Sequence, residues 1–538
     1  MITQGIVTGG PSLSIPAHLS FGQYVIDRLR SFCETNKDCL INYETGNKVT
    51  SKEFLKDIVS IATGLRKLQL KRGNTIGIFS ENRNEYLAAV LGAVCCGATV
   101  TTINAIYKPD ELKHALSIAN PTVMFCSQST LKNNLRVLKA TPSIKTIIQF
   151  DGTPTETGII RYKKIKMDAN IWEFEPADVQ QGSSDTLFLQ YSSGTTGLSK
   201  AVMLTHLNVL YAVACFDYGY IRECCSRILI AMPWSHIYGL AVTIHLLTCN
   251  KLVVYLPKFS SDRYFDAIQK YKIEALYTVP PILVIISKLP IVSQWDLSSI
   301  KRISCGAAPL SAETTQSVLE RLPNCTGIIQ GYGMTELSLG AIKCTDDLNS
   351  VNKPGSCGRP VPGVKIKVVN IETREILGPY MEGEICIKGP LVMKGYAGNA
   401  TATKEIMDNE GYLKTGDIGY YDDDGYFFIV DRLKELIKYK GNQVAPAAIE
   451  STLLQHSCVA DCGVVGAPDE AAGELPTAFI VLKPNVKPNK EDILQFTEQK
   501  LSPVSRLRGG IIFTNEIPKN PSGKILRRVL KQRLSQIK

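Results

Sequence analysis

The chain has 538 residues, of which 44% are hydrophobic and 20% are charged. This composition excludes a disordered, a collagen-like and a coiled-coil protein, and it indicates a globular chain long enough for several core-forming units. The net charge is +10, and nine basic residues stand against one acid between Leu501 and Lys538. Such an end is typical of contacts with nucleic acid, membranes or phosphorylated small molecules, but also of a solvated helix face, so charge alone leaves the function open.

The cysteines and the two ends of the chain bear on the compartment. No CxxC pair occurs among the 16 cysteines, which disfavours a zinc site or a small disulfide scaffold and favours reduced thiols. No secretory signal is visible at the amino end, and Gln536 to Lys538 do not form the peroxisomal Ser-Lys-Leu address. We therefore expect a cytoplasmic protein, with a peroxisomal location still open.

An α/β rhythm runs through most of the chain. Phe54, Ile58, Ile61 and Leu65 recur at helical spacing, and the apolar run 75–80 then predicts a buried strand, with a second helix from about residue 84. Two long uncharged runs, 86–107 and 228–250, are interrupted by turn residues and predict helix and strand pairs rather than membrane spans. Further strands are expected at residues 122–126, 146–150, 228–232, 252–256 and 275–279.

The sequence pattern changes after about residue 352. Short β-like runs with frequent glycine and proline, at 364–369, 383–388 and 425–430, predict an antiparallel or barrel-like subdomain. A turn and one more strand lead to a junction near 431–434, after which new α/β units begin. Motion between the two parts is the default expectation at such a junction.

The most distinctive local motif is Tyr191-Ser-Ser-Gly-Thr-Thr-Gly-Leu-Ser-Lys200. Glycines allow backbone N–H groups to approach phosphate oxygens, hydroxyls donate further hydrogen bonds, and the lysine adds a positive charge. It is not a Walker A loop, because Leu198 and Ser199 separate Gly197 from Lys200. Taken alone, the stretch is more typical of a flexible loop.

Five further motifs follow in a fixed order: Gly306-Ala-Ala-Pro309, Gly331-Tyr-Gly-Met-Thr-Glu336, Tyr412-Leu-Lys-Thr-Gly-Asp417, Asp431-Arg-Leu-Lys-Glu-Leu-Ile-Lys438 and Pro518-Lys-Asn-Pro-Ser-Gly-Lys524. With this set the chain resembles the adenylate-forming superfamily from about residue 22 to residue 531, most of all its 4-coumarate CoA ligase and luciferase branch. The resemblance implies an α/β fold. It places two α/β sheet subdomains and a β-barrel-like subdomain in a large N-terminal domain (1–433), followed by a small mobile α+β C-terminal domain (434–538).

The resemblance also implies a nucleotide site. Thr335 would contact the α-phosphate, and Glu336 would hold Mg²⁺, an ion that prefers oxygen ligands. Asp417 would accept hydrogen bonds from the ribose with help from Arg432, and Lys434 would serve both this site and the hinge. The remaining ATP-binding residues would be Ser192, Ser193, Gly194, Thr195, Thr196, Gly197, Lys200, Ala307, Ala308, Gln330, Gly331 and Tyr332.

The chemistry and the other two substrates follow from the same resemblance. Lys524 would bridge the acid carboxylate and the α-phosphate, and His236 would gate the acid site. After rotation of the small domain Lys438 would replace Lys524 at the adenylate. The acid would lie against His236, Tyr238, Ala308, Gly331 and Leu339, and CoA would contact Lys258, Lys440 and Gly441. The catalytic residues are thus expected to be Lys524, Lys438, His236 and Thr335.

Several positions depart from the family pattern. Ser199 stands where a proline is usual and Ala201 where a glycine is usual; the first change loosens the loop, and the second is harmless unless φ is positive. Leu337-Ser-Leu-Gly340 is bulkier than in beetle luciferases, and Ala212 replaces their basic side chain. Both changes favour an aliphatic or simple aryl acid over a beetle luciferin.

These observations predict an ATP-dependent acid-CoA ligase that uses ATP, Mg²⁺ and CoA and acts on a small-molecule carboxylic acid. A luciferase that oxidises an adenylated luciferin with O₂ remains an alternative, because the adenylate itself carries most of that reactivity. A non-catalytic adenylate-binding protein is a third possibility, although the residues whose loss would mark it (Lys524, Glu336 and Asp417) are present. We expect no nucleic-acid partner and a monomer or weak oligomer.

Overall fold

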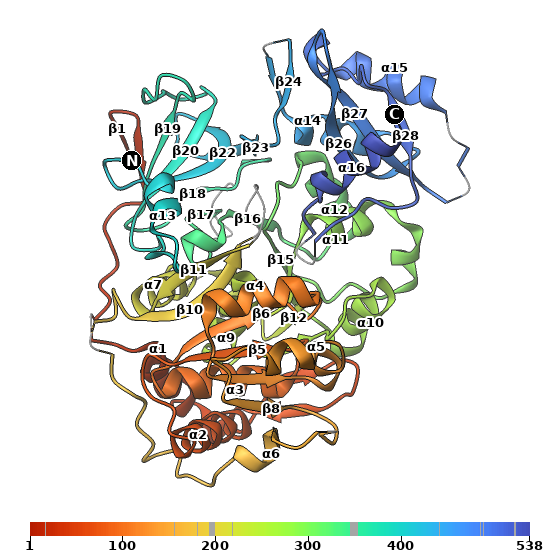
Figure 1. Cartoon of the computed structure of the whole chain (residues 1–538). Helices are drawn as coiled ribbons and strands as arrows, with labels where there is room; N and C mark the ends of the chain where they lie inside the picture. The colour runs from red at the N-terminus through yellow and green to blue at the C-terminus, as the bar shows by residue number, and fades with distance from the viewer. Residues whose placement is uncertain are drawn as a thin grey trace.

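The computed structural model describes residues 1–16, 18–154, 156–179, 181–192, 199–217, 219–344, 353–440, 442–484, 486–487, 489–520 and 523–537. The chain forms four β-sheets (Figure 1). Two large sheets, both mainly parallel and flanked by helices, make up the lower part of the view in Figure 1. A third, antiparallel sheet and the small C-terminal sheet lie above them on opposite sides. The α/β class expected from the sequence is confirmed.

The first large sheet has eight strands, of which six run parallel. In sheet order they are β21 (Gly395–Tyr396), β11 (Lys200–Thr205), β10 (Thr186–Ser192), β6 (Thr99–Ile103), β5 (Thr75–Phe79), β7 (Val123–Cys126), β8 (Thr146–Gln149) and β9 (Ile159–Arg161). The strand order reverses direction at β5, so the carboxyl ends of β5, β6 and β7 form the kind of crevice at which open α/β sheets bind ligands.

The second large sheet has nine strands with a parallel centre. In sheet order they are β18 (Arg359–Pro360), β17 (Ile342–Lys343), β16 (Ile328–Tyr332), β15 (Arg302–Cys305), β14 (Ala275–Thr278), β12 (Arg227–Ile230), β13 (Leu252–Tyr255), β3 (Asp38–Asn42) and β4 (Lys48–Thr50). The two uncharged runs fold as predicted, one into a helix followed by β6 and the other into β12 followed by a helix.

The helices follow the apolar patterns of the sequence. In chain order they are α1 (Phe21–Arg30), α2 (Ser51–Lys67), α3 (Asn84–Cys95), α4 (Pro109–Ala119), α5 (Gln128–Lys139), α6 (Tyr162–Ile165), α7 (His206–Phe216), α8 (Tyr220–Cys224), α9 (Ile237–Thr248), α10 (Ser261–Tyr271), α11 (Pro280–Lys288), α12 (Ala312–Arg321), α13 (Ala400–Ile406), α14 (Pro446–Gln455), α15 (Lys490–Lys500) and α16 (Arg527–Ile537). Thr50 and Glu53 form a capping box that starts α2. Its apolar face is buried against α1 and α3. Within the described part of the chain no helix is both long and apolar enough to cross a membrane.

The third sheet is antiparallel, as the glycine- and proline-rich texture predicts. Its six strands follow the order β1 (Ile2–Thr3), β2 (Ile6–Thr8), β19 (Lys365–Val369), β20 (Gly383–Lys388), β22 (Leu413–Tyr421) and β23 (Phe427–Arg432). Among the described residues the order is an open path rather than a closed barrel. The amino end supplies its first two strands, and Figure 1 shows the N-terminus beside this sheet. The sequence did not predict this.

The residues after the junction form a sheet with a core of its own. Its strands are β25 (Asn442–Val444), β24 (Ile437–Tyr439), β27 (Gly473–Leu482) and β26 (Val459–Asp469), with β28 (Ile511–Phe513) paired to β27. The apolar cluster between this sheet, α14 and α15 draws its buried residues from 437–511 alone. A division near residue 433 into two mobile parts stays a prediction, and this separate core supports it.

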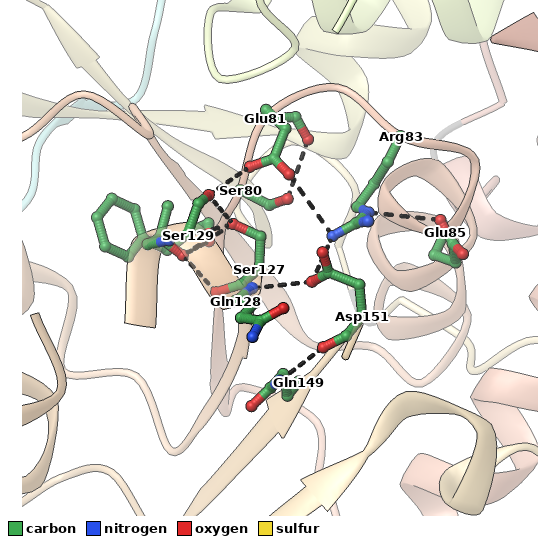
Figure 2. A network of polar contacts seen from close by, with 11 residues as sticks. Ser80, Glu81, Arg83, Glu85, Ser127, Gln128, Ser129, Gln149 and Asp151 are labelled. Atoms are coloured by element: carbon green, nitrogen blue, oxygen red, sulfur yellow. Dashed lines mark hydrogen bonds and ion pairs between the residues drawn. The ribbon is translucent and has the colours of Figure 1, made fainter. Parts of the chain in front are cut away.

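A polar network ties together the carboxyl ends of β5, β7 and β8 (Figure 2). At its centre Arg83 lies 2.9 Å from Asp151, 3.5 Å from Glu85 and 3.7 Å from Glu81. Burial alone would raise the pKa of Asp151, but the hydrogen bonds from Arg83 and from the Gln128 N–H outweigh it and lower that pKa. The guanidinium of Arg83 therefore balances negative charge of the carboxylates, and the network fixes the loop that follows β5.

Burial of His206 predicts a loss of stability in acid. Its Nδ1 accepts a hydrogen bond of 3.0 Å from the Phe21 N–H, and burial lowers its pKa to about 4. The unfolded chain takes up this proton near pH 6.5, so the contribution is complete above that pH and declines as pH falls toward 4. The loss reaches about 2 kcal/mol by about pH 5, at about 1.4 kcal/mol per pH unit.

We expect His206→Gln to flatten the dependence of the free energy of unfolding on pH between about pH 6.5 and pH 4, measured by urea unfolding. The exposed His18 offers the matched control, and His18→Gln should leave the wild-type profile unchanged. Identical acid profiles for wild type and His206→Gln would contradict the argument.

Candidate functional site

One large cavity of about 1900 Å³ collects most of the predicted site residues. It opens at the carboxyl ends of the parallel strands β10, β14, β15 and β16, and residues within 519–520 and 524–535 of the C-terminal part line its other side. The predicted residues on its wall are Ser192, Lys200, His236, Tyr238, Ala307, Gln330, Gly331, Tyr332, Thr335, Glu336, Leu339, Arg432, Lys434 and Lys524. Segments more than 300 residues apart in the chain therefore meet at one site.

Other predicted residues lie elsewhere. Ser193, Gly194, Thr195, Thr196, Gly197 and Gly441 fall outside the described residues. Ala308 is half-buried beside the cavity, and its neighbour Ala307, whose φ is +73°, forms the wall instead. Lys258, Lys438 and Lys440 are exposed and do not belong to the lining of this cavity. In this arrangement the chain thus presents Lys524 to the cavity and holds Lys438 and Lys440 away from it.

Lys524 reaches the cavity within a cluster of charges. Its Nζ lies 3.3 Å from Glu435, which also accepts a hydrogen bond from Arg527. Burial, followed by the positive charge of Arg432, lowers the pKa of Lys524. A partly desolvated ammonium with one nearby carboxylate interacts strongly with any additional negative charge placed beside it.

Asp417 is buried behind the cavity wall, on β22. Its carboxylate accepts a hydrogen bond of 2.6 Å from the Tyr332 hydroxyl and lies 3.2 Å from Nε of Arg432. Burial raises the pKa of Asp417, and the nearby charge of Arg432 opposes that rise. The three side chains form a connected polar group, of which Tyr332 and Arg432 face the cavity.

Glu336 supplies a buried carboxylate to the same wall. It is 4% exposed and accepts a hydrogen bond of 2.9 Å from the Tyr396 hydroxyl. The ammonium of Lys200 lies 4.8 Å from the centre of the Tyr396 ring. A carboxylate oxygen that faces the cavity beside a hydroxyl fits a hard cation such as Mg²⁺.

His236 stands at the start of α9, with its side chain on the cavity wall. Its Nε2 is buried and has no hydrogen-bond partner among the described residues, and burial lowers the pKa of the ring. A neutral imidazole with a free nitrogen that faces a cavity is available to a bound molecule. Tyr238 follows two residues later and packs against Gly306.

Comparison with known proteins identifies the family. The model of the AMP-binding enzyme family matches residues 30–397, and that of the AMP-binding enzyme C-terminal domain matches residues 448–524. The chain is an AMP-binding enzyme of the adenylate-forming superfamily.

Relatives of this AMP-binding enzyme include both branches expected from the motifs. It is 38% identical to a luciferin 4-monooxygenase of Nipponoluciola cruciata over 92% of this chain and 91% of that protein. It is also 38% identical to a probable 4-coumarate–CoA ligase 3 of Dictyostelium discoideum over 90% of each chain. Among solved structures, the anthranilate CoA ligase AuaEII in complex with anthranoyl-AMP is similar, with a TM-score of 0.87 and 25% identity over 97% of this chain and 98% of that one.

The supports of His236 in this AMP-binding enzyme were not evident from its sequence. Asn82, in the loop after β5, donates a hydrogen bond of 3.0 Å to the carbonyl of Met232 and accepts one of 2.9 Å from the N–H of Trp234. Thr102 donates to the Ser235 carbonyl at 3.1 Å. The loop fixed by Arg83 thus holds the turn that carries His236, and only a contact across the two large sheets reveals this.

We expect Asn82→Ala to displace that turn and to lower the free energy of unfolding by about 1–3 kcal/mol, because two buried backbone groups lose their partners. With any acid that the AMP-binding enzyme activates, KM for the acid should rise while KM for ATP stays the same. Asn82→Asp, which keeps one of the two bonds, should have a smaller effect on the acid KM. Equal changes in both KM values would show that Asn82 does not act through His236.

Three of the residues that differ from the family pattern can now be located in the structure. Ala201 lies in β11 and is absent from the described residues with positive φ, so alanine is not strained there. Ser199 uses its carbonyl to contact His114 at 2.8 Å. Ala212 is fully buried on α7 rather than on the cavity wall, where Phe216, one turn later, is found with Leu339.

Proposed function

We propose that this enzyme is an ATP-dependent carboxylic acid–CoA ligase, which forms an acyl-adenylate and then an acyl-CoA thioester from a fatty or aryl acid. One observation carries the proposal: a cavity of about 1900 Å³ holds Lys524, Thr335 and Glu336 together with His236, whose Nε2 has no partner among the described residues. The curated 4-coumarate–CoA ligases and the anthranilate CoA ligase structure support it.

In the first half-reaction an oxygen of the acid carboxylate forms a bond to the α-phosphorus of ATP, and the bond to the bridging oxygen of pyrophosphate breaks. Lys524 and the Thr335 hydroxyl stabilise the charge that develops on the α-phosphate oxygens. His236 orients the carboxylate through its free nitrogen. Glu336 would hold Mg²⁺, which neutralises phosphate charge when bound. Gln330, Gly331 and Tyr332 surround the adenine, and Arg432, with the Asp417 carboxylate paired behind it, receives the ribose.

In the second half-reaction the CoA sulfur attacks the acyl carbonyl, AMP leaves and the thiol proton is released. Lys438, Lys440 and Gly441 would take part only after the small domain turns about Lys434. Lys258 on the other side would add a further contact to CoA. The exposed positions of Lys258, Lys438 and Lys440 in the present arrangement agree with a role that needs this motion.

Pyrophosphate release with ATP and Mg²⁺, measured across fatty, cinnamic and benzoic acids with and without CoA, tests the proposal. One acid class should release pyrophosphate, and CoA should convert the product into a thioester. If no acid releases pyrophosphate although ATP binds, the ligase reaction is wrong and a non-catalytic adenylate-binding role takes its place.

A luciferase-type reaction is a second candidate, favoured by 36–38% identity to several luciferin 4-monooxygenases. Light measured in the same wells with beetle luciferin and O₂ tests it. We expect little light, because Leu339 and Phe216 narrow the acid site.

A further inference from the structure

Glu384 is a buried carboxylate to which the proposed mechanism gives no role. It lies on β20, is 5% exposed and belongs to the wall of the cavity. One of its oxygens accepts a hydrogen bond of 2.5 Å from Nη1 of Arg374, and the other accepts one of 3.0 Å from the N–H of Gly416 on β22. A buried carboxylate needs such partners, and here one of them is the backbone of the neighbouring strand, at the residue before Asp417.

The backbone at Gly416 departs from regular pairing between β20 and β22. Glu384 pairs with Ile418, but Cys386 pairs with Lys414, so three residues of β22 stand opposite a single residue of β20. Such a bulge changes the direction in which a strand presents its side chains, and bulges are frequent beside active sites. Gly416 has φ +69° within it, a value that favours glycine.

Hydrogen bonds fix this bulge from several directions. The Thr415 hydroxyl donates to the β20 carbonyl opposite the bulge at 2.7 Å and accepts a bond of 3.1 Å from the Asp417 N–H. The Gly416 carbonyl accepts a bond of 2.8 Å from the Leu433 N–H, beside the junction with the C-terminal part. Glu384 engages the N–H of Gly416, and this contact comes from a side chain rather than from the backbone pairing of the sheet.

The bulge sets the position of Asp417. The Asp417 carboxylate accepts a bond of 2.6 Å from the Tyr332 hydroxyl and lies 3.2 Å from Nε of Arg432, and both of these side chains face the cavity. In the proposed function the ribose of the nucleotide lies against this group. A shift of the bulge would therefore move the groups that meet the ribose hydroxyls.

A role in stability alone is the competing interpretation, because Glu384 also forms an ion pair with Arg374. The Arg374 side chain is 41% exposed, and ion pairs with an exposed partner contribute little to stability. The contact with Gly416 instead joins a buried carboxylate to a bulge next to a binding residue. The geometry therefore favours placement of the binding group over support of the fold.

We propose that Glu384 is a positioning residue for recognition of the ribose. It holds the bulge at Gly416 and thereby keeps Asp417 in place behind the two side chains that face the ribose hydroxyls. The preference of the enzyme for ribonucleotides over deoxyribonucleotides therefore depends on Glu384. This inference rests on the proposed function for the place of the ribose, but its test needs neither an identified acid nor CoA.

Calorimetric binding of AMP, 2′-deoxy-AMP and 3′-deoxy-AMP to the full-length protein tests this role. Wild type should bind AMP about tenfold more tightly than either deoxynucleotide, as expected for hydrogen bonds to charged groups. In Glu384→Ala the Kd for AMP should rise about tenfold and that for the deoxynucleotides less than about twofold, because only contacts to the hydroxyls are lost. Glu384→Gln should retain most of the preference, since its amide oxygen can still accept the Gly416 N–H.

Glu382→Ala, an exposed change two residues earlier and outside the cavity lining, is the matched control and should bind like wild type. If Glu384→Ala does not fold, Glu384→Asp, which withdraws the carboxylate by one methylene group, carries the same test. An equal rise in Kd for all three nucleotides, unchanged values, or a wild type without preference would overturn the inference and leave the ligase function standing. Failure of wild type to bind AMP would count against the nucleotide site and the proposed function.

A double variant tests whether Glu384 acts through Asp417. The preference for AMP that remains in Asp417→Asn should fall no further when Glu384→Ala is added, because both changes remove the same contacts. Losses of preference that add in the double variant would contradict the positioning role.

Discussion

Replacement of Lys524 by alanine is expected to slow acyl-adenylate formation by about 10²–10³-fold, the usual effect of removing one group that stabilises transition-state charge. Lys524 is the residue of the C-terminal part that places a partly desolvated ammonium in the cavity beside Glu435. Because Lys438 and Lys440 would serve the second half-reaction, conversion of a synthetic acyl-adenylate and CoA into thioester should proceed at the wild-type rate. Both rates are measured on the same preparation.

Lys531→Ala is the matched control for this experiment. Lys531 lines the same cavity from α16 but is paired with Glu474 at 3.2 Å, and its loss should change adenylation by less than about tenfold, as for an exposed ion pair. Equal losses in Lys524→Ala and Lys531→Ala would mean that only the overall positive charge matters. If Lys524→Ala slows adenylate formation and thioester formation by the same factor, the lysines do not have separate roles.

Arg527→Leu is expected to have the largest effect on stability, about 3–5 kcal/mol, because it leaves a buried carboxylate without its partner. Nη2 of Arg527 contacts both oxygens of Glu450 at 2.8 and 2.9 Å, and both side chains are nearly buried. Burial raises the pKa of Glu450 to about 7 even beside this guanidinium. Calorimetry should show a lower transition temperature, and hydrogen exchange should show faster opening of α14 and β26.

The double variant Arg527→Leu/Glu450→Leu separates charge from packing. When both partners are removed together, Glu450 no longer leaves an unpaired charge, and part of the lost stability should return. The rest stays lost, because Glu435 and Asp431 still lack the charge of Arg527. If the double variant is as unstable as the sum of the two single variants, the two side chains do not act as a pair.

The sequence predicted those parts of the molecule that depend on local pattern. Apolar runs between turn residues located β5, β7, β8, β12, β13 and β14 to within about two residues, because buried strands need continuous apolar side chains. The antiparallel third sheet followed from its glycine- and proline-rich texture. The residues of the cavity were predicted by resemblance. Thr335 and Lys524 are 189 positions apart, and nothing in their local sequence indicates that they lie close together in the fold.

Features that depend on distant partners could not be read in this way. Asn82 is one polar residue in a loop until the fold places it against Met232 and Trp234. Asp417 likewise lies buried behind Tyr332 because β22 pairs with its neighbouring strands. The local motif that contains Asp417 does not reveal this position.

The two short strands at the amino end have a practical consequence for anyone who handles this protein. Residues 6–8 pair with 365–367 and thereby cover the free backbone of β19, whose remaining sheet neighbours lead through β20 to the strand that bears Asp417. An uncovered strand of this kind, with the sequence Lys-Ile-Lys-Val-Val, is a template for pairing between molecules. Purification tags are therefore better joined to the carboxyl end. Removal of residues 1–8 should expose β19 and increase self-association of the protein.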